Sequence, residues 1–290
     1  MSQAGRVARF LVVLLAVAAR PAAAKNISIT ITPRVELQGD AVVAQVGVRN
    51  GGDESAQSVS VTLIFRDQQV RGQIRPELAP QQAMDASLSI PAAGLQAGHW
   101  PYRVAIDYTD ANQYPFQALH AGILTVGTPP LARVAIPSVT APALSTTGTL
   151  RVHLKNLSGV ARAATVSGAT PEGIEITTPP AQLTLAPWGE VDVEHGVANR
   201  TALAGSRYPV FVTVEYEDEG VHQAVIGQGI IEIRTNQSFF ETWRVAFWIG
   251  AAVFVMIWLA ILVWRLTAPR RQRQGETRAA SRQRRGETRS

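Results

Sequence analysis

The chain of 290 residues is 46% hydrophobic and 17% charged, carries a formal net charge of +5, and contains no cysteine. The absence of cysteine excludes disulfides, thiol catalysis and cysteine-ligated metal. The positive charge lies at the two ends, with +3 in residues 1–24 and +7 in residues 265–290, so residues 25–264 carry −5. A mildly acidic central region argues against nucleic acid as its partner.

Residues 1–24 have the pattern of a secretory signal peptide. Arg6 and Arg9 precede a ten-residue apolar stretch, Phe10–Ala19, and the small residues Ala22–Ala24 follow. This order predicts export and cleavage before Lys25. An uncleaved N-terminal anchor is the alternative, which we disfavour because ten apolar residues are too few to cross a bilayer.

Residues 25–235 contain two copies of one pattern. Val46–Asn50 matches Val152–Asn156 at an offset of 106 positions, and Trp100–Asp110 matches Tyr208–Asp218 at an offset of 108. A period this long indicates two whole domains rather than a solenoid. We therefore predict a first domain at 25–127, a linker at 128–130 and a second domain at 131–235.

Apolar and polar residues alternate within each copy, as in Val42–Val48 and Val210–Tyr216. Alternation of this kind is typical of antiparallel strands that bury one face. About seven short strands in roughly 100 residues predict an immunoglobulin-like β-sandwich. The expected fold class is all-β, with two tandem immunoglobulin-like β-sandwiches plus one C-terminal transmembrane α-helix. Pro129 and Pro130 favour an extended linker that would place the sandwiches end to end.

Turn and core residues recur in both copies: an asparagine after the first alternating strand (Asn50, Asn156), a Leu-Ala-Pro turn, and a Tyr-x-Asp strand end. This pattern resembles the prokaryotic Ig-like modules called NEW3 and CARDB, over Val42–Val126 and Gly148–Ile233. The first copy departs from it by lacking a clear Pro-x-Gly segment. The resemblance implies a binding or spacer role beside a C-terminal membrane anchor, and it brings no catalytic residues.

Two tryptophans are candidate binding residues. Trp100 lies at a strand entrance and Trp188 lies in the turn after Pro187. An exposed indole can contact a sugar or a peptide. Tyr102 and Tyr108 share a strand face with apolar residues, and we predict them to be core.

Glu215, Glu217, Asp218 and Glu219 form an acidic cluster at a strand end. Calcium binding is one interpretation, but the Asp-x-Asp-x-Asp-Gly spacing of a calcium loop is missing. We therefore favour a solvated strand end. The five histidines are scattered, so we expect no metal site.

Residues 245–264 carry no charge and are long enough to span a bilayer, with 236–244 as a connector. The arginine-rich segment 265–290 predicts a cytoplasmic C-terminus and a disordered tail. Ala246 and Gly250 lie one helical turn apart and would allow a homodimer. The tail would contact anionic lipid, or alternatively an acidic protein or RNA, through Arg270, Arg271, Arg273, Arg284 and Arg285.

No hydrolase elbow, phosphate loop or zinc-helix motif occurs in the sequence, so we predict no enzymatic activity and no cofactor. The expected function is that of a single-pass bacterial membrane protein that presents two Ig-like domains outside the cell membrane. It would bind a protein partner as an accessory subunit or scaffold of an envelope or export complex. The alternative is a carbohydrate-binding accessory partner of a glycan-processing membrane enzyme.

Overall fold

The computed structural model describes residues 26–234 and 239–267 and divides the chain into two compact units after Thr235. Over these described residues, the first unit, here called the β unit, consists of strands and their connections, and the second contains one helix. This mostly-β fold with one apolar C-terminal helix confirms the coarse fold prediction. The predicted signal peptide lies outside the described residues.

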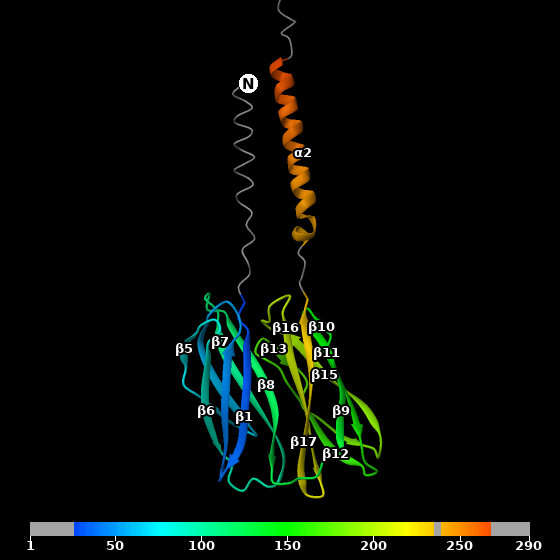
Figure 1. The fold of residues 1–290 in the computed structure, drawn as a ribbon. Coiled ribbons are helices and arrows are strands. Elements are labelled where there is room, and N and C mark those ends of the chain that lie inside the picture. Colours follow the sequence, from blue (N-terminus) through cyan, green and yellow to red (C-terminus); the bar gives the residue numbers. More distant parts are fainter. Residues whose placement is uncertain (1–25, 235–238, 268–290) are drawn as a thin grey trace, which may run out of the picture. The chain divides into compact units, whose positions relative to one another are not determined.

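Within residues 26–234 the β unit has seventeen strands. Figure 1 shows how they are arranged. In chain order they are β1 (Ile29–Gln38), β2 (Ala41–Asn50), β3 (Ala56–Phe65), β4 (Gln68–Arg71), β5 (Arg75–Leu78), β6 (Ala83–Pro91), β7 (Gly98–Thr109), β8 (Pro115–Val126), β9 (Val134–Thr140), β10 (Ala143–Leu144), β11 (Thr147–Asn156), β12 (Arg162–Ala169), β13 (Ile174–Ile176), β14 (Ala181–Leu185), β15 (Glu190–Asn199), β16 (Arg207–Asp218) and β17 (Val221–Ile233).

These strands form three sheets. A three-stranded sheet has the order β1-β2-β6, and a four-stranded sheet has the order β13-β15-β11-β9. Between them lies a ten-stranded sheet whose main path is β14-β12-β16-β17-β7-β3-β4. This large sheet contains strands from both sequence copies, so each copy packs its own small sheet against one part of a shared large sheet.

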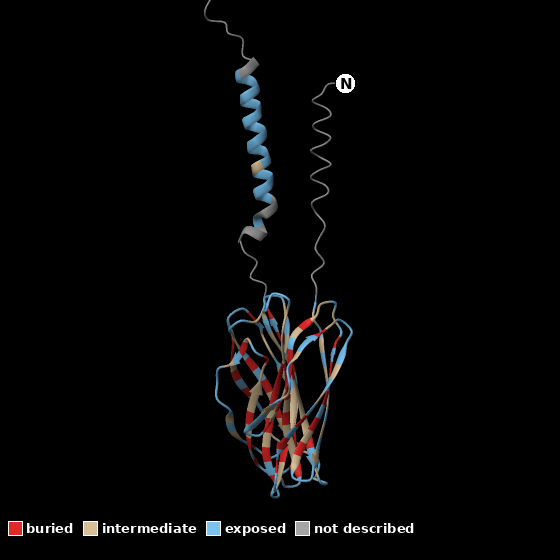
Figure 2. Ribbon diagram, turned by 90° about the vertical axis from the view of Figure 1, so that its left-hand side faces the viewer, coloured by how far each residue is buried: buried red, intermediate tan, exposed pale blue. Residues whose placement is uncertain are grey.

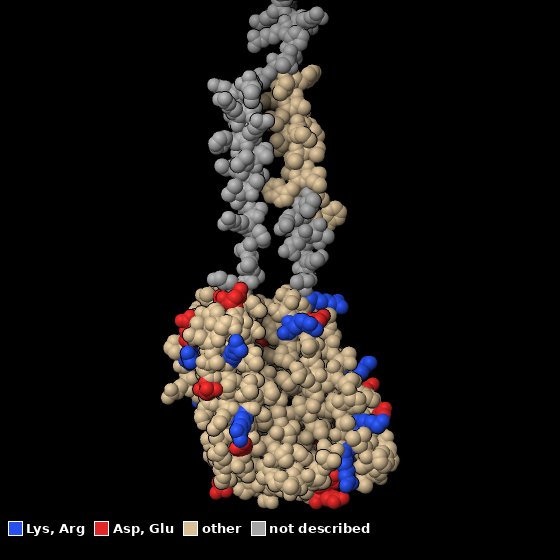
Figure 3. Space-filling view, viewed as in Figure 1, with Lys and Arg blue, Asp and Glu red and all other residues tan. Residues whose placement is uncertain are grey.

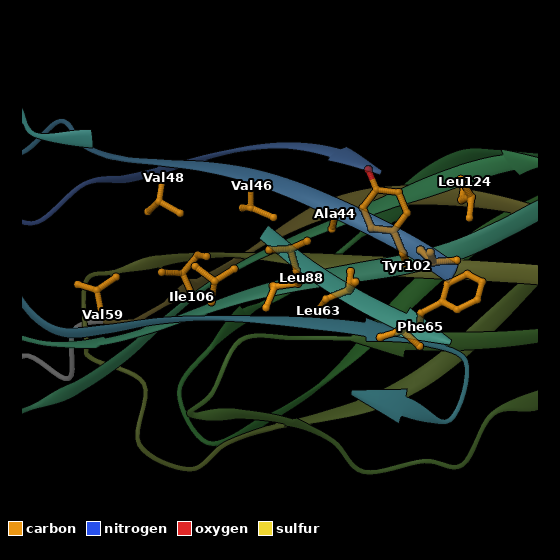
Figure 4. Packing of buried hydrophobic residues seen from close by; sticks show 14 of the residues in the cluster. Ala44, Val46, Val48, Val59, Leu63, Phe65, Leu88, Tyr102, Ile106 and Leu124 are labelled. Carbon is orange, nitrogen blue, oxygen red and sulfur yellow. The ribbon is translucent and has the colours of Figure 1, made fainter. Parts of the chain in front are cut away.

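The alternating pattern places one hydrophobic cluster in each half of the β unit. In β2 the even-numbered residues Val42 to Val48 are at most 1% exposed, and they pack against Leu63 and Ile106 of the large sheet. Figure 4 shows these side chains meeting between the sheets. In the second half, Val210 to Tyr216 of β16 line the equivalent cluster. Full burial of each aliphatic side chain contributes about 1.5–3 kcal/mol to the stability of the fold. The alternating pattern therefore determines which face of each strand is buried.

The two halves lie side by side and run in opposite directions. β17 pairs with β7 in parallel, at His222 and Gly98, whereas β17 is antiparallel to β16, the sequence counterpart of β7. A third apolar cluster, formed by Ala105, Leu119 and Phe211, fills the junction from the outer faces of the hairpins β7–β8 and β16–β17. The predicted end-to-end arrangement is therefore wrong.

The linker explains this difference. The chain turns at Gly127, whose φ is +67°, a value that glycine adopts without strain. The side-chain amide of Gln223 then donates to the carbonyl of Pro130 at 3.3 Å. The two prolines therefore lie against the second half instead of extending away from the first.

The helix α2 (Phe239–Thr267) follows the β unit. Its segment Ala246–Arg265 has a mean hydropathy of 2.6, and none of it is buried (Figure 2). A helix of 20 residues spans about 30 Å, the thickness of the hydrocarbon core. Among the described residues, α2 is therefore a helix that is long enough and apolar enough to cross a membrane.

Candidate functional site

Trp100 lies in the junction between the two halves. Its ring stacks on the imidazole of His222, with centroids 4.0 Å apart and planes 16° apart. The guanidinium of Arg66 lies 5.3 Å from the Trp100 ring centroid, and the indole N–H donates to the carbonyl of Gln96 at 3.0 Å. The structure thus places Trp100 as a junction residue, held by groups of both halves.

A groove of about 590 Å³ opens beside this stack. Arg66, Trp100 and Arg103 line it from the first half, and Glu215 and His222 line it from the second. A second groove of about 780 Å³ adjoins it over β12 and shares Glu215 and His222 with it. The row of small side chains on the outer face of β12, such as Ala163 and Thr165, leaves this space open.

His222 lies in the junction between two carboxylates, those of Glu215 and Glu217. Its Nδ1 lies 3.1 Å from a carboxylate oxygen of Glu217, and its Nε2 lies 3.3 Å from one of Glu215. Burial lowers the pKa of His222, but the two carboxylates outweigh burial, so its pKa is raised above the ordinary value. Protonated His222 therefore stabilises the folded junction.

This raised pKa predicts a specific pH dependence. Because the pKa of His222 is higher in the folded state than in the unfolded state, its protonation adds to the free energy of unfolding. This contribution is complete at a pH below the unfolded-state pKa of about 6.5, and it is lost as the pH rises through the folded-state pKa. We expect the unfolding midpoint of the wild type to fall, relative to that of His222→Gln, as the pH rises above about 6.5. Thermal unfolding of both proteins over a series of buffers measures this, and parallel pH profiles would contradict it.

The side chains of the acidic cluster do not converge on one point. Glu215 and Glu217 lie on the outer face of β16 beside His222, whereas Asp218 points inward, because successive strand residues face opposite sides. Asp218 is 2% exposed and pairs with the buried Arg162 at 2.7 Å. Within residues 26–234 and 239–267, no group of three or more histidine or carboxylate side chains is placed to hold a metal ion.

Trp188 is exposed, at 67% of its surface, in the turn between β14 and β15. Its φ of +53° is unusual for a bulky residue, and Gln81 has a φ of +63° at the same point of the first copy. The backbone N–H of Trp188 donates to the carbonyl of Ser158 at 2.9 Å, which fixes the turn against the β11–β12 turn. The structure therefore holds this indole outward on a defined backbone.

Four more exposed apolar side chains lie on segments that adjoin the Trp188 turn in the chain or are linked to it through backbone hydrogen bonds. We call the set the Trp188 patch: Leu131 (88% exposed), Leu157 (44%), Val160 (58%), Trp188 (67%) and Val191 (37%). Leu131 lies between β8 and β9, Leu157 and Val160 lie in the β11–β12 turn, and Val191 lies at the start of β15, so the order of residues along the chain does not indicate this set.

The Trp188 patch and Trp100 lie at the same end of the β unit. β12 and β17 both pair antiparallel with β16, so both begin at one end, which we call the far end. The opposite end, where β17 stops at Ile233, is the near end, from which the chain continues to α2. Trp100 and Trp188 share the far end, but the groove of about 590 Å³ is lined by Trp100 and not by Trp188.

On the face shown in Figure 3, acidic and basic side chains are intermixed, and no large area of a single sign appears. The candidate lipid-contacting residues of the tail lie outside the described residues: Arg270, Arg271, Arg273, Arg284 and Arg285.

No protein-family model matches the chain, and no curated protein matches its sequence. Similar solved structures include a mutant alpha-2-macroglobulin from Salmonella, with 12% identity, a TM-score of 0.31, and coverage of 72% of this chain and 16% of that one. Escherichia coli alpha-2-macroglobulin activated by porcine elastase has 13% identity and a TM-score of 0.29, and the match covers 74% of this chain and 23% of that one. Red sea bream transglutaminase has 14% identity and a TM-score of 0.25, and the match covers 77% of this chain and 33% of that one. The chain spans at most about a third of each of these proteins.

Proposed function

We propose that this chain is a single-pass membrane protein that presents two NEW3/CARDB-type Ig-like domains on the exterior side. Its function is to bind a protein partner of the cell envelope through the Trp188 patch, as an accessory or scaffold subunit without catalytic activity. The arginine-rich tail holds the C-terminus in the cytoplasm.

The Trp188 patch carries this proposal. Exposed apolar residues that occur singly need no explanation, but five from neighbouring segments at one end of a domain mark an interaction site. Tryptophan is enriched among the residues that dominate binding energy in protein interfaces. The patch lies at the far end of the β unit, where these side chains are exposed.

A glycan ligand is the second candidate function, and it rests on the same exposed indole. A sugar platform needs aromatic faces that are open to solvent, and Trp100 is stacked on His222 while Trp188 has aliphatic neighbours. We therefore favour a protein partner over a glycan.

Crosslinking in intact cells tests the proposal. A photo-reactive amino acid at Val160, inside the patch and 58% exposed, should give a discrete protein adduct, whereas the same probe at Ile74, 59% exposed in the first half, should give none. Trp188→Asn, which suits the left-handed backbone, should weaken the partner's binding about thirtyfold or more. Equal labelling at Val160 and Ile74 would contradict the proposal. Binding of an envelope glycan that Trp188→Asn abolishes, without a protein adduct, would favour the glycan candidate.

A further inference from the structure

A cavity of about 520 Å³ lies at the near end of the β unit, between the two halves. Tyr108 and Phe116 line it from the β7–β8 hairpin, and Tyr208 lines it from β16. Glu54 and Asp110 supply two carboxylates to the same cavity. We call it the Tyr108 cavity, and it is separate from the Trp188 patch at the far end.

The aromatic walls are held in place by packing and hydrogen bonds. The rings of Tyr108 and Phe116 stack with centroids 5.6 Å apart and planes 17° apart, and Tyr114 lies 5.1 Å from Phe116. The hydroxyl of Tyr114 donates to the carbonyl of Thr201, which ties the hairpin to the second half. The hydroxyl of Tyr208 accepts the N–H of Leu203 at 3.2 Å. These contacts preorganise the cavity across the junction.

The charge in the Tyr108 cavity is negative and lacks a cationic partner. The backbone N–H of Tyr114 and that of Asn112 each donate to Asp110 at 2.8 Å, and they lower the pKa of this carboxyl. Within residues 26–234, no basic side chain forms an ion pair with Glu54 or Asp110. Arg207 also lines the cavity, but it pairs with Glu232 at 3.1 Å.

Tyr108 stays a neutral phenol in this setting. Burial, followed by the neighbouring Tyr208, raises the pKa of Tyr108 to about 12. The phenol ring therefore keeps the electron-rich face that attracts a cation, and it adds no negative charge of its own.

We infer that the Tyr108 cavity binds an organic ammonium group of the choline type. Faces of aromatic rings attract cations within about 6 Å, and quaternary ammonium is recognised by aromatic cages with nearby carboxylates. A volume of about 520 Å³ lies within the range of small-molecule sites. The same chemistry is carried by a free solute and by the headgroup of phosphatidylcholine.

The full chain in a maltoside detergent provides the test, by calorimetric titration with choline and with neohexanol, its uncharged isostere. We expect choline to bind at least tenfold more tightly than neohexanol. Phe116→Leu, which keeps an apolar side chain but removes the ring face, and Glu54→Gln should each weaken choline binding about tenfold. Trp188→Asn, at the far end, should leave it unchanged.

Equal affinities for choline and neohexanol, or no binding of choline at millimolar concentration, would overturn the inference. Unfolding midpoints identify a variant that has lost its fold. If Phe116→Leu is unstable, the choline affinity of Glu54→Gln tests the inference instead. Choline titrations of the full chain in lipid nanodiscs distinguish a lipid headgroup from a free solute as the ligand. A lipid headgroup in the cavity predicts that choline binds more weakly in phosphatidylcholine discs than in phosphatidylglycerol discs, and equal affinity identifies a free solute.

Discussion

Asp218→Ala is expected to lower the free energy of unfolding of the β unit by about 3–5 kcal/mol, because it leaves the Arg162 guanidinium buried without its partner. The side chains of Asp218 and Arg162 are 2% and 5% exposed, and their closest atoms are 2.7 Å apart. Arg162 also lies over the ring of Tyr216 and donates from Nε to the hydroxyl of Ser158 at 3.2 Å, so it cannot turn outward to water without breaking these contacts. Chemical denaturation followed by circular dichroism measures the loss.

Glu194→Ala is the matched control for this ion pair. Glu194 pairs with Arg151 at 2.9 Å, but both side chains are more than half exposed. An exposed pair gains little because water already solvates both charges. A loss of stability in Asp218→Ala no larger than that in Glu194→Ala would show that the Asp218–Arg162 pair does not hold β12 to β16.

Asn156→Ala should cost about 3 kcal/mol, the second-largest effect that we expect, because the substitution leaves several buried backbone groups without partners. The side-chain amide of Asn156 is fully buried and donates to the carbonyls of Val160 at 2.8 Å and Ala186 at 2.9 Å. Its carbonyl oxygen accepts the N–H of Ser158 at 3.0 Å. One side chain thus joins the β11–β12 turn to the Leu-Ala-Pro turn.

Asn50→Ala should have a similar effect in the first half. Asn50 is also fully buried, donates to the carbonyls of Glu54 at 2.7 Å and Leu78 at 3.1 Å, and accepts the N–H of Gly52 at 3.0 Å. Asn112→Ala, in an exposed turn, is the control and should change the midpoint little. A small effect of Asn50→Ala beside a large effect of Asn156→Ala would contradict an equivalent role for the two asparagines.

The alternating pattern predicted the strands and their buried faces because burial of one face is a local property of a strand. The same periodicity correctly placed Tyr102 in the first core, where it is 8% exposed. The repeated asparagine and Leu-Ala-Pro motifs have the same hydrogen-bonding role in both halves. The uncharged segment before the tail is indeed one long apolar helix.

The acidic cluster could not be understood from spacing alone. Neighbouring residues of a strand face opposite sides, so Asp218 points to Arg162 in the interior while Glu217 points to His222. The sequence contained these residues, but their partners lie on other strands. The sequence did not indicate the Trp188 patch for a similar reason, because Leu131, Leu157 and Val160 come from segments that are distant from Trp188 in the chain.

By itself, the sequence determined the β-strand content, the buried faces of the strands and the apolar helix, since each depends on residues close together in the chain. Only the tertiary structure decided how the halves meet. Their junction depends on a few outward-facing residues, Ala105, Leu119 and Phe211, which the alternating pattern cannot distinguish from ordinary surface positions. The stack of Trp100 on His222 and the Tyr108 cavity both arise from that lateral packing, because residues about a hundred positions apart come into contact only when the linker folds back.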